Sequence, residues 1–225
     1  MKKVAFFCEG YSEANSVIKF LNRIGIGCYE LKKSNSELQD GCHGIFIHNS
    51  QGDGRLLRNF QELGKVLIEK YKYDYVIAWC DCNDSNRCPK IIMEQIIKNI
   101  PCEDSSCRDY CKAHLILLGS IKCLENWYLA DINTIHQILL NGKQNKEWDS
   151  FLKKIKEKSE NFSNVENIPV IPLLEELSQK VKKQKFDKVE IAIKFFSKFS
   201  FKDVKGSPSF ARTIKILKKI FEIDK

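Results

Sequence analysis

The segment 73–80, Tyr-Asp-Tyr-Val-Ile-Ala-Trp-Cys, is almost continuously apolar and is followed at once by Asp81. An apolar run of this length indicates a strand that is buried on both faces, as in the centre of a parallel sheet. Such a strand needs helices on both sides of its sheet, and this requirement favours an α/β architecture.

Strand-like and helix-like segments alternate around this run across the first 140 residues. We expect strands at 3–8, 28–31, 44–48, 73–80 and 114–119, and helices at 12–24, 56–71, 89–98 and 124–140. The cysteine-rich segment 101–112 is expected to be a loop. This alternation predicts an α/β fold whose mostly parallel sheet is flanked by helices.

From residue 141 onward the pattern is helical only. We expect helices at 148–158, 173–183, 188–199 and 207–221, with Pro169 and Pro172 marking a break between the first two. We therefore predict two domains, an α/β core at 1–142 and a basic helical C-terminal extension at 143–225 that packs on it. The extension carries the whole net charge of +8, because it contains 20 Lys and Arg residues and 12 Asp and Glu residues. A basic surplus favours contact with nucleic-acid phosphates, although Lys-rich helical faces are often only solvated surface.

The composition is that of a soluble globular protein, with 43% hydrophobic and 29% charged residues. No apolar run approaches the roughly 18 residues that cross a bilayer, and the N-terminus does not read as a signal peptide. Ten cysteines in 225 residues are too few for a disulfide framework, so we expect a cytoplasmic location and no membrane partner. The sequence has no P-loop or GxGxxG motif, and ATP binding would have to come from a partner protein.

Acidic residues follow two of the expected strands. Glu9 comes after the first strand, and Asp81, Asn83 and Asp84 come after the central strand. The carboxyl ends of parallel strands share one edge of a sheet, where ligands gather. Alternation along the strand end places residues Asp81 and Asn83 on one side, about 7 Å apart along the chain. Their hard oxygen ligands suit Mg²⁺. Singly, Asp81 could be a strand-end or capping residue and Glu9 a turn residue, but together they favour a metal site.

Four short motifs in this order resemble the TOPRIM fold of topoisomerases, primases and OLD-type nucleases, and more narrowly the small RloB-like proteins. The motifs are Phe7-Cys8-Glu9-Gly10-Tyr11-Ser12-Glu13, Trp79-Cys80-Asp81-Cys82-Asn83-Asp84, Leu124-Glu125-Asn126-Trp127-Tyr128-Leu129-Ala130-Asp131 and Ser207-Pro208-Ser209-Phe210-Ala211-Arg212. The resemblance spans most of the chain and implies a TOPRIM-like sheet.

The resemblance also implies a function. It makes the chain a nuclease or related phosphodiester-bond enzyme that uses Mg²⁺ or Mn²⁺, with an association with defence systems and an ATPase partner. Carried over residue by residue, the catalytic groups are Glu9, Asp81 and Asn83, and the metal ligands are Glu9, Asp81, Asn83 and Asp84, with Glu125 as a further candidate ligand. Asn83 departs from the pattern, which normally has an Asp there, and Asp84 could replace it. The alternative is therefore a catalytically degenerate nucleic-acid-binding or regulatory subunit of an ATPase-containing complex.

The last expected helix combines a polar start with a basic face. Ser207, Ser209 and Arg212 could hold a phosphate at the helix N-terminus, or Ser207 and Pro208 could simply cap the helix. Arg212, Lys215, Lys218 and Lys219 are the candidate nucleic-acid-binding residues.

Six cysteines lie between positions 80 and 111. Cys88, Cys102, Cys107 and Cys111 are the set that could form a tetrahedral zinc site, although no Cys-x-x-Cys knuckle is present. Unligated thiols and disulfides remain open alternatives for the same residues.

Overall fold

The computed structural model describes residues 2–27, 31–32, 44–82, 89–100, 102, 104–160, 164–200 and 206–222. Five strands form one parallel sheet in the order β2-β3-β1-β4-β5. They are β1 (Val4–Cys8), β2 (Leu31–Lys32), β3 (Ile45–Asn49), β4 (Tyr75–Asp81) and β5 (Leu115–Ser120). The expected strand at 28–31 lies partly outside the described residues.

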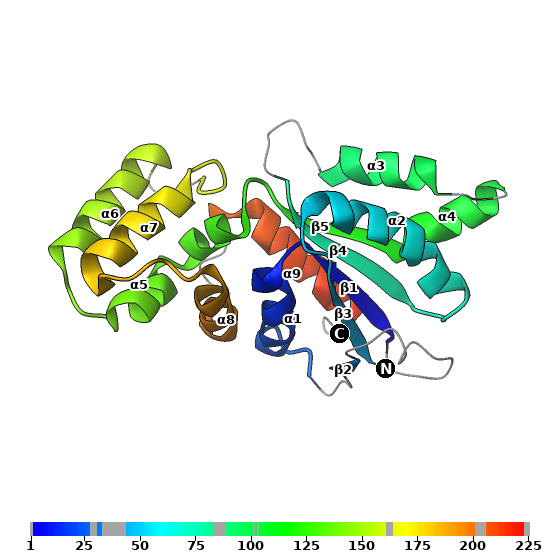
Figure 1. Cartoon of the computed structure of the whole chain (residues 1–225), viewed down its shortest axis with the longest axis horizontal. Helices are drawn as coiled ribbons and strands as arrows, with labels where there is room; N and C mark the ends of the chain where they lie inside the picture. Colours follow the sequence, from blue (N-terminus) through cyan, green and yellow to red (C-terminus); the bar gives the residue numbers. More distant parts are fainter. Residues whose placement is uncertain are drawn as a thin grey trace.

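Helices cover both faces of this sheet (Figure 1). They are α1 (Tyr11–Arg23), α2 (Asp53–Glu69), α3 (Pro89–Asn99), α4 (Ser105–His114), α5 (Ile132–Leu140), α6 (Lys146–Lys158), α7 (Val170–Lys182), α8 (Lys188–Lys198) and α9 (Pro208–Ile220). A 3-10 helix, η2 (Leu124–Asp131), precedes α5. The expected TOPRIM-like class, a mostly parallel sheet flanked by helices with a helical C-terminal extension, is confirmed.

Strand β1 shows why the sheet needs both helical layers. All five of its residues are buried, as the nearly unbroken apolar sequence predicts. Ala5 and Phe7 point into a core shared with α2, α3 and α4, whereas Val4, Phe6 and Cys8 point into a core shared with α1, α8 and α9.

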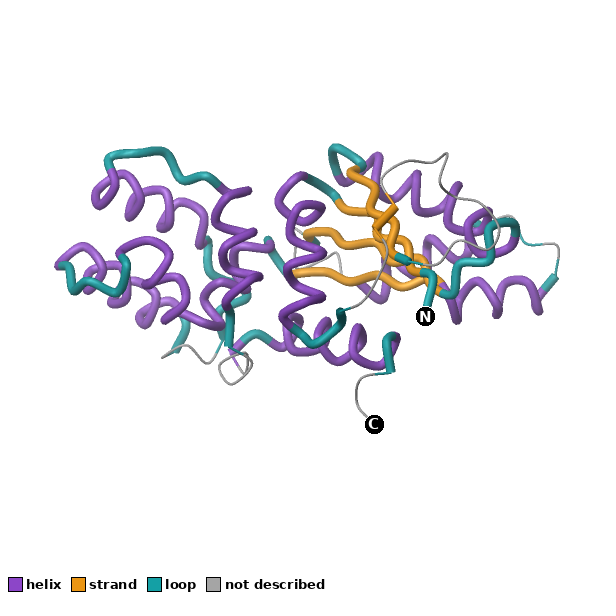
Figure 2. The backbone as a smooth tube through the Cα atoms, turned by 90° about the horizontal axis from the view of Figure 1, so that it is seen from below, coloured by secondary structure: helices purple, strands orange, loops and turns teal. Residues whose placement is uncertain are grey.

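The C-terminal helices complete the second core. Phe20 of α1 contacts the rings of Phe196, Phe199 and Phe210 at centroid distances of 5.1, 5.6 and 5.8 Å. Helices α8 and α9 therefore pack directly on the α/β unit. Helices α5, α6 and α7 lie together at one end of the molecule (Figures 1 and 2), and their apolar side chains continue the same core. The division at residue 142 stays a prediction.

Two local expectations are wrong. The segment 101–112 is not a continuous loop, because α4 begins at Ser105 and Asp104 caps it by accepting the Cys107 N–H at 2.7 Å. The expected helix 124–140 is two elements, since η2 ends at Asp131, whose side chain caps α5 through the Thr134 N–H at 3.1 Å. The expected break between the helices before and after the prolines is present between α6 and α7, and Pro169 precedes α7, whereas Pro172 lies inside its first turn.

No helix in the described part of the chain is long and apolar enough to cross a bilayer.

Candidate metal and nucleic-acid site

Glu9 and Asp81 meet at the carboxyl edge of the sheet. Strands β1 and β4 are parallel neighbours; β1 ends at Cys8, which pairs with Trp79, and β4 continues for two more residues to Asp81. The Asp81 N–H donates to Glu9 Oε2 at 3.0 Å. From the adjacent strand β5, the Ser120 hydroxyl donates to Asp81 Oδ1 at 2.5 Å. The expected juxtaposition of these two acidic residues is thus present in the structure.

Glu13 and Glu125 enlarge this group. Glu13 lies in the first turn of α1, is 7% exposed, and accepts the Gly10 N–H at 3.0 Å through Oε2. Glu125, in the first turn of η2, is 5% exposed, and Lys188 Nζ lies 3.5 Å from its Oε1. We call Glu9, Glu13, Asp81 and Glu125 the acidic cluster.

The cluster is electrostatically strained without a cation. The pKa of Glu13 is raised to about 7, chiefly by desolvation and also by the charges of Glu9 and Glu125, while backbone hydrogen bonds lower it in part. Desolvation also raises the pKa of Asp81 well above its ordinary value, with contributions from Glu13, Glu125 and Glu9. Buried carboxyls that raise one another's pKa are characteristic of functional sites.

Several buried polar groups of the described residues around the cluster make no hydrogen bond. Within the described ranges, Ser50 Oγ, Asn49 Nδ2 and the Tyr128 hydroxyl are buried without a hydrogen-bond partner. Ser50 and Asn49 end β3, beside β1, where the Ser50 N–H donates to the Cys8 carbonyl at 2.9 Å. Burial raises the pKa of Tyr128, and Glu125, Glu13 and Asp81 add to it, so this ring lies close to the cluster. Unpaired buried groups of this kind are rare in folded proteins and are frequent at binding sites.

The cluster is spread over the strand ends. Among the described residues, no three of the carboxylates bring oxygens within 4.8 Å of one another. Asn83 and Asp84, the other predicted ligands, lie outside the described residues, so the part of the site that follows Cys82 is a prediction from sequence alone.

Glu13 is the acidic residue that sequence reasoning missed. A Glu in the first turn of a helix is ordinary, because it compensates the helix dipole, so its type alone does not mark a site. Its signal was its spacing, because a helix that starts at Tyr11 places the third helical residue back over the turn that holds Glu9.

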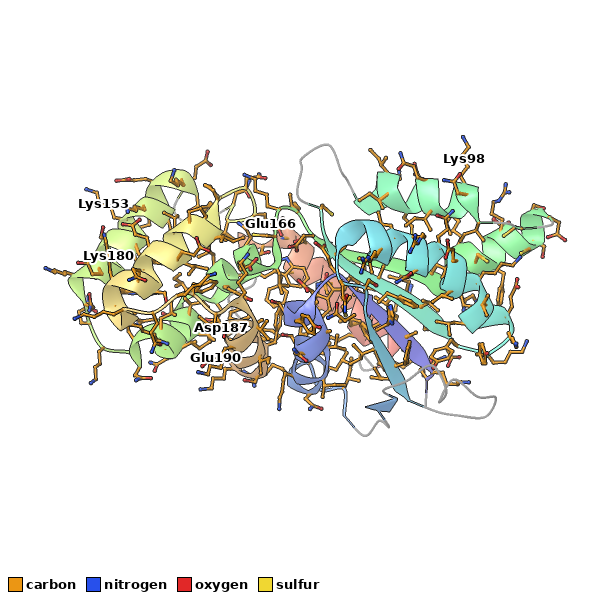
Figure 3. The ribbon with its side chains drawn as sticks, viewed as in Figure 1. Lys98, Lys153, Glu166, Lys180, Asp187 and Glu190 are labelled. Atoms are coloured by element: carbon orange, nitrogen blue, oxygen red, sulfur yellow. The ribbon has the colours of Figure 1, made fainter. Side chains whose placement is uncertain are left out.

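The start of α9 is occupied by a carboxylate from another segment. Glu166 Oε1 accepts the Ser209 N–H and the Ser207 hydroxyl, both at 2.7 Å, and also the Ser209 hydroxyl. Glu166 is 2% exposed and lies beside the first turn of α9 (Figure 3). The Ser207 side chain makes no capping hydrogen bond. The sequence suggested either a bound phosphate or Ser207 as the group that caps the start of this helix. The structure has the Glu166 carboxylate there, a residue that the sequence analysis did not single out.

Helix α9 runs antiparallel to β5. Its start is near η2, where the Trp127 Nε1–H donates to Ser209 Oγ at 2.8 Å. Its end is near the start of β1, where Lys2 Nζ lies 3.6 Å from Glu222 Oε1. The predicted lysines Lys215, Lys218 and Lys219, which we call the α9 lysines, thus lie in the second half of α9, toward the amino edge of the sheet and away from the acidic cluster.

Two cavities follow the outer side of β5. The larger, of about 560 Å³, lies between α3, α4, β5 and α9. The smaller, of about 250 Å³, continues toward Gly119 and Ile121 at the carboxyl edge. Both include Leu117, Arg212 and Ile216. Arg108, Lys112 and Arg212 line the larger cavity, and we call them the groove cations.

Three of the four predicted zinc ligands come together away from the acidic cluster. The Sγ atoms of Cys102, Cys107 and Cys111 all lie within 4.8 Å of one another. Cys88 lies outside the described residues.

The fold matches that of a known protein over its whole length. The C-terminal region of the Burkholderia pseudomallei OLD protein aligns with a TM-score of 0.56 and 13% sequence identity, covering 99% of this chain and 98% of that chain. The C-terminal region of the Xanthomonas campestris pv. campestris OLD protein aligns with a TM-score of 0.49 and 13% identity, covering 100% and 98%. No family model and no curated protein matches the sequence. The chain therefore has the fold of an OLD C-terminal region, in line with the broader predicted resemblance, whereas the narrower RloB-like resemblance stays a prediction.

Proposed function

We propose that this protein is a nuclease or related phosphodiester-bond enzyme of the TOPRIM class that depends on Mg²⁺ or Mn²⁺. The observation that carries the proposal is the contact of Glu9 with Asp81 at the carboxyl edge of a parallel sheet, with Glu13 and Glu125 near enough to raise the pKa of Asp81. The likeness to an OLD C-terminal region supports it at the level of fold.

The chemistry of the acidic cluster fits a hard divalent cation. Glu9 and Asp81 would hold the ion, with Asn83 or Asp84 completing the set and Glu13 or Glu125 as further oxygen donors. The bound ion would neutralise charge on the phosphate and activate water for attack. Ser120 fixes the Asp81 carboxylate through the 2.5 Å hydrogen bond, and Lys188 compensates the charge of Glu125.

The groove beside β5 offers a path for the nucleic acid. Five cationic side chains line its larger cavity, the three groove cations together with Lys90 and Lys98, against the acidic Glu94 and Asp109. The smaller cavity continues past Arg212 to Gly119 and Ile121, the two neighbours of Ser120, and Ser120 pairs with Asp81 at the end of β5. Cationic grooves hold the phosphate backbone by charge, with little dependence on base sequence. We therefore assign the groove cations to substrate binding, beside the α9 lysines that the sequence predicted.

A cleavage assay tests the proposal directly. The full chain is incubated with single- and double-stranded DNA and RNA, with Mg²⁺, Mn²⁺ or a chelator. We expect ion-dependent cleavage that is lost in Glu9→Gln and Asp81→Asn and is kept in Glu175→Gln, a matched change at an exposed position of α7. Full activity in Asp81→Asn would refute the metal-site assignment.

Two observations favour a second candidate. Asn83 takes the place of an expected acidic residue, and no three described carboxylates converge on one point. Both features fit a degenerate subunit that binds nucleic acid or regulates an ATPase partner. Salt-sensitive binding without cleavage under any ion would select this alternative. The ATPase partner, the defence association and the cytoplasmic location remain predictions from sequence.

A further inference from the structure

Three thiols converge where α4 packs against the end of α2. Cys107 and Cys111 are four residues apart on α4, so they share one face of the helix, and Cys102 lies in the segment that enters it. The Cys102 and Cys111 Sγ atoms are 4.0 Å apart. The cap from Asp104 to the Cys107 N–H holds this turn of the helix in place.

A carboxylate lies beside one of the three thiols. Glu69, the last residue of α2, places Oε1 at 3.6 Å from Cys107 Sγ, and Lys65 Nζ lies 3.8 Å from that oxygen. Cys111 is buried, whereas Cys102 and Cys107 are partly exposed, so the group can be reached from solvent.

We propose that Cys102, Cys107 and Cys111 bind one Zn²⁺ through their thiolates, with Glu69 as the fourth ligand. Zinc–sulfur bonds of about 2.3 Å in a tetrahedron separate the sulfurs by about 3.8 Å. The 4.0 Å between Cys102 and Cys111 is therefore already close to the required spacing. Binding exchanges three thiol protons, which pass to solvent, for one ion, and no oxidant or reductant takes part. Lys65 offsets part of the negative charge of the four ligands.

The zinc is structural and independent of the proposed nuclease site. Helix α2 ends just before β4 begins, and α4 leads directly into β5, so the thiols lie near the amino edge of the sheet. The acidic cluster lies at the opposite edge. Four protein ligands leave no open position for a substrate. The ion ties α2 to α4 and to the segment at Cys102 on one face of the sheet.

Metal analysis of the purified full chain tests the proposal. The protein is prepared in reducing buffer without chelator, and its zinc content is measured by elemental mass spectrometry. We expect one zinc per chain in the parent and in the control Cys123→Ser, whose thiol is partly buried elsewhere and contacts Asn126 Oδ1 at 2.9 Å. We expect no zinc in Cys102→Ser or Cys107→Ser. Glu69→Gln should bind zinc at least about tenfold more weakly, because the loss of a residue that only hydrogen-bonds to a metal ligand already lowers metal affinity by about this factor.

A second measurement covers variants that fail to fold. Co²⁺ added to the chelator-treated parent should give thiolate-to-cobalt charge-transfer absorption and the visible bands of a tetrahedral complex. A parent without zinc that also lacks these bands would overturn the proposal. A Cys102–Cys111 disulfide in non-reducing peptide mapping of freshly purified protein would overturn it too. Neither result would bear on ion-dependent cleavage, because the two sites lie at opposite edges of the sheet.

Discussion

Replacing Glu13 by Gln should stabilise the metal-free protein at neutral and alkaline pH. The Glu13 carboxyl is nearly buried beside Glu9 and Glu125, and its pKa is raised from 4.5 to about 7. Gln removes the charge and keeps an oxygen that accepts the Gly10 N–H. The change therefore removes a repulsion from the folded state without removing the hydrogen bond at the start of α1.

The size and sign of this effect follow from the two pKa values. Between pH 4.5 and about 7 the folded chain binds more protons than the unfolded chain, so the free energy of unfolding falls as pH rises. Each pKa unit corresponds to about 1.4 kcal/mol, and the full loss above pH 8 is therefore about 3 kcal/mol. Glu13→Gln should match the parent near pH 4.5 and should exceed its stability by up to about 3 kcal/mol at pH 8.

Urea unfolding followed by tryptophan fluorescence measures this difference. Parent and Glu13→Gln are compared between pH 4.5 and 8 with a chelator present, and Glu175→Gln serves as the exposed control that should follow the parent throughout. A Glu13→Gln difference that is the same at both ends of the range, or no gain at pH 8, would show that Glu13 is not buried among like charges.

Three further predictions concern other parts of the molecule. Asp81→Asn should raise the melting temperature of the metal-free protein, because the carboxylate repels its acidic neighbours. It should also abolish the stabilisation by Mg²⁺ that calorimetry measures in the parent, because the same carboxylate binds the ion, and an unchanged Mg²⁺ response would contradict this. Glu166→Ala should destabilise the fold by about 1–3 kcal/mol in urea unfolding, since it leaves the Ser209 N–H and the Ser207 hydroxyl buried without an acceptor; a loss below about 0.5 kcal/mol would show that water replaces the carboxylate. Replacement of the groove cations by Gln should make the slope of log affinity against log salt shallower, by about 0.7 per lost contact with single strands or 0.9 with duplex. This change in slope, measured by fluorescence anisotropy with oligonucleotides, should exceed the change caused by replacing the α9 lysines. A larger change for the α9 lysines would place the binding surface on α9.

The strand ends could be predicted from the sequence because burial on both faces leaves a clear apolar pattern. The run 73–80 indicated β4, and the polar residue after it indicated the edge at which Asp81 meets Glu9. The same logic gave the expected fold class.

Long-range contacts could not be predicted in this way. Glu166 reaches the start of α9 across about 40 residues, and nothing in its local sequence distinguishes it from a surface Glu. Helix α4 was missed for a different reason. Its apolar face consists largely of Cys107 and Cys111, which read as a cysteine-rich loop although free Cys packs as a small hydrophobe.

Because the second core needs α8 and α9, it cannot be completed until long after the strands of the sheet have been synthesised. The five strands have all been made by Ser120, but α9 begins only at Pro208, about 90 residues later. At typical rates of roughly 5–20 residues per second, this delay lasts about 5–20 s. During that time the side of β1 that carries Val4, Phe6 and Cys8 has α1 beside it but lacks α8 and α9, which complete its cover. The nascent chain therefore exposes part of this apolar core to the ribosome surface and to chaperones until α9 has been made.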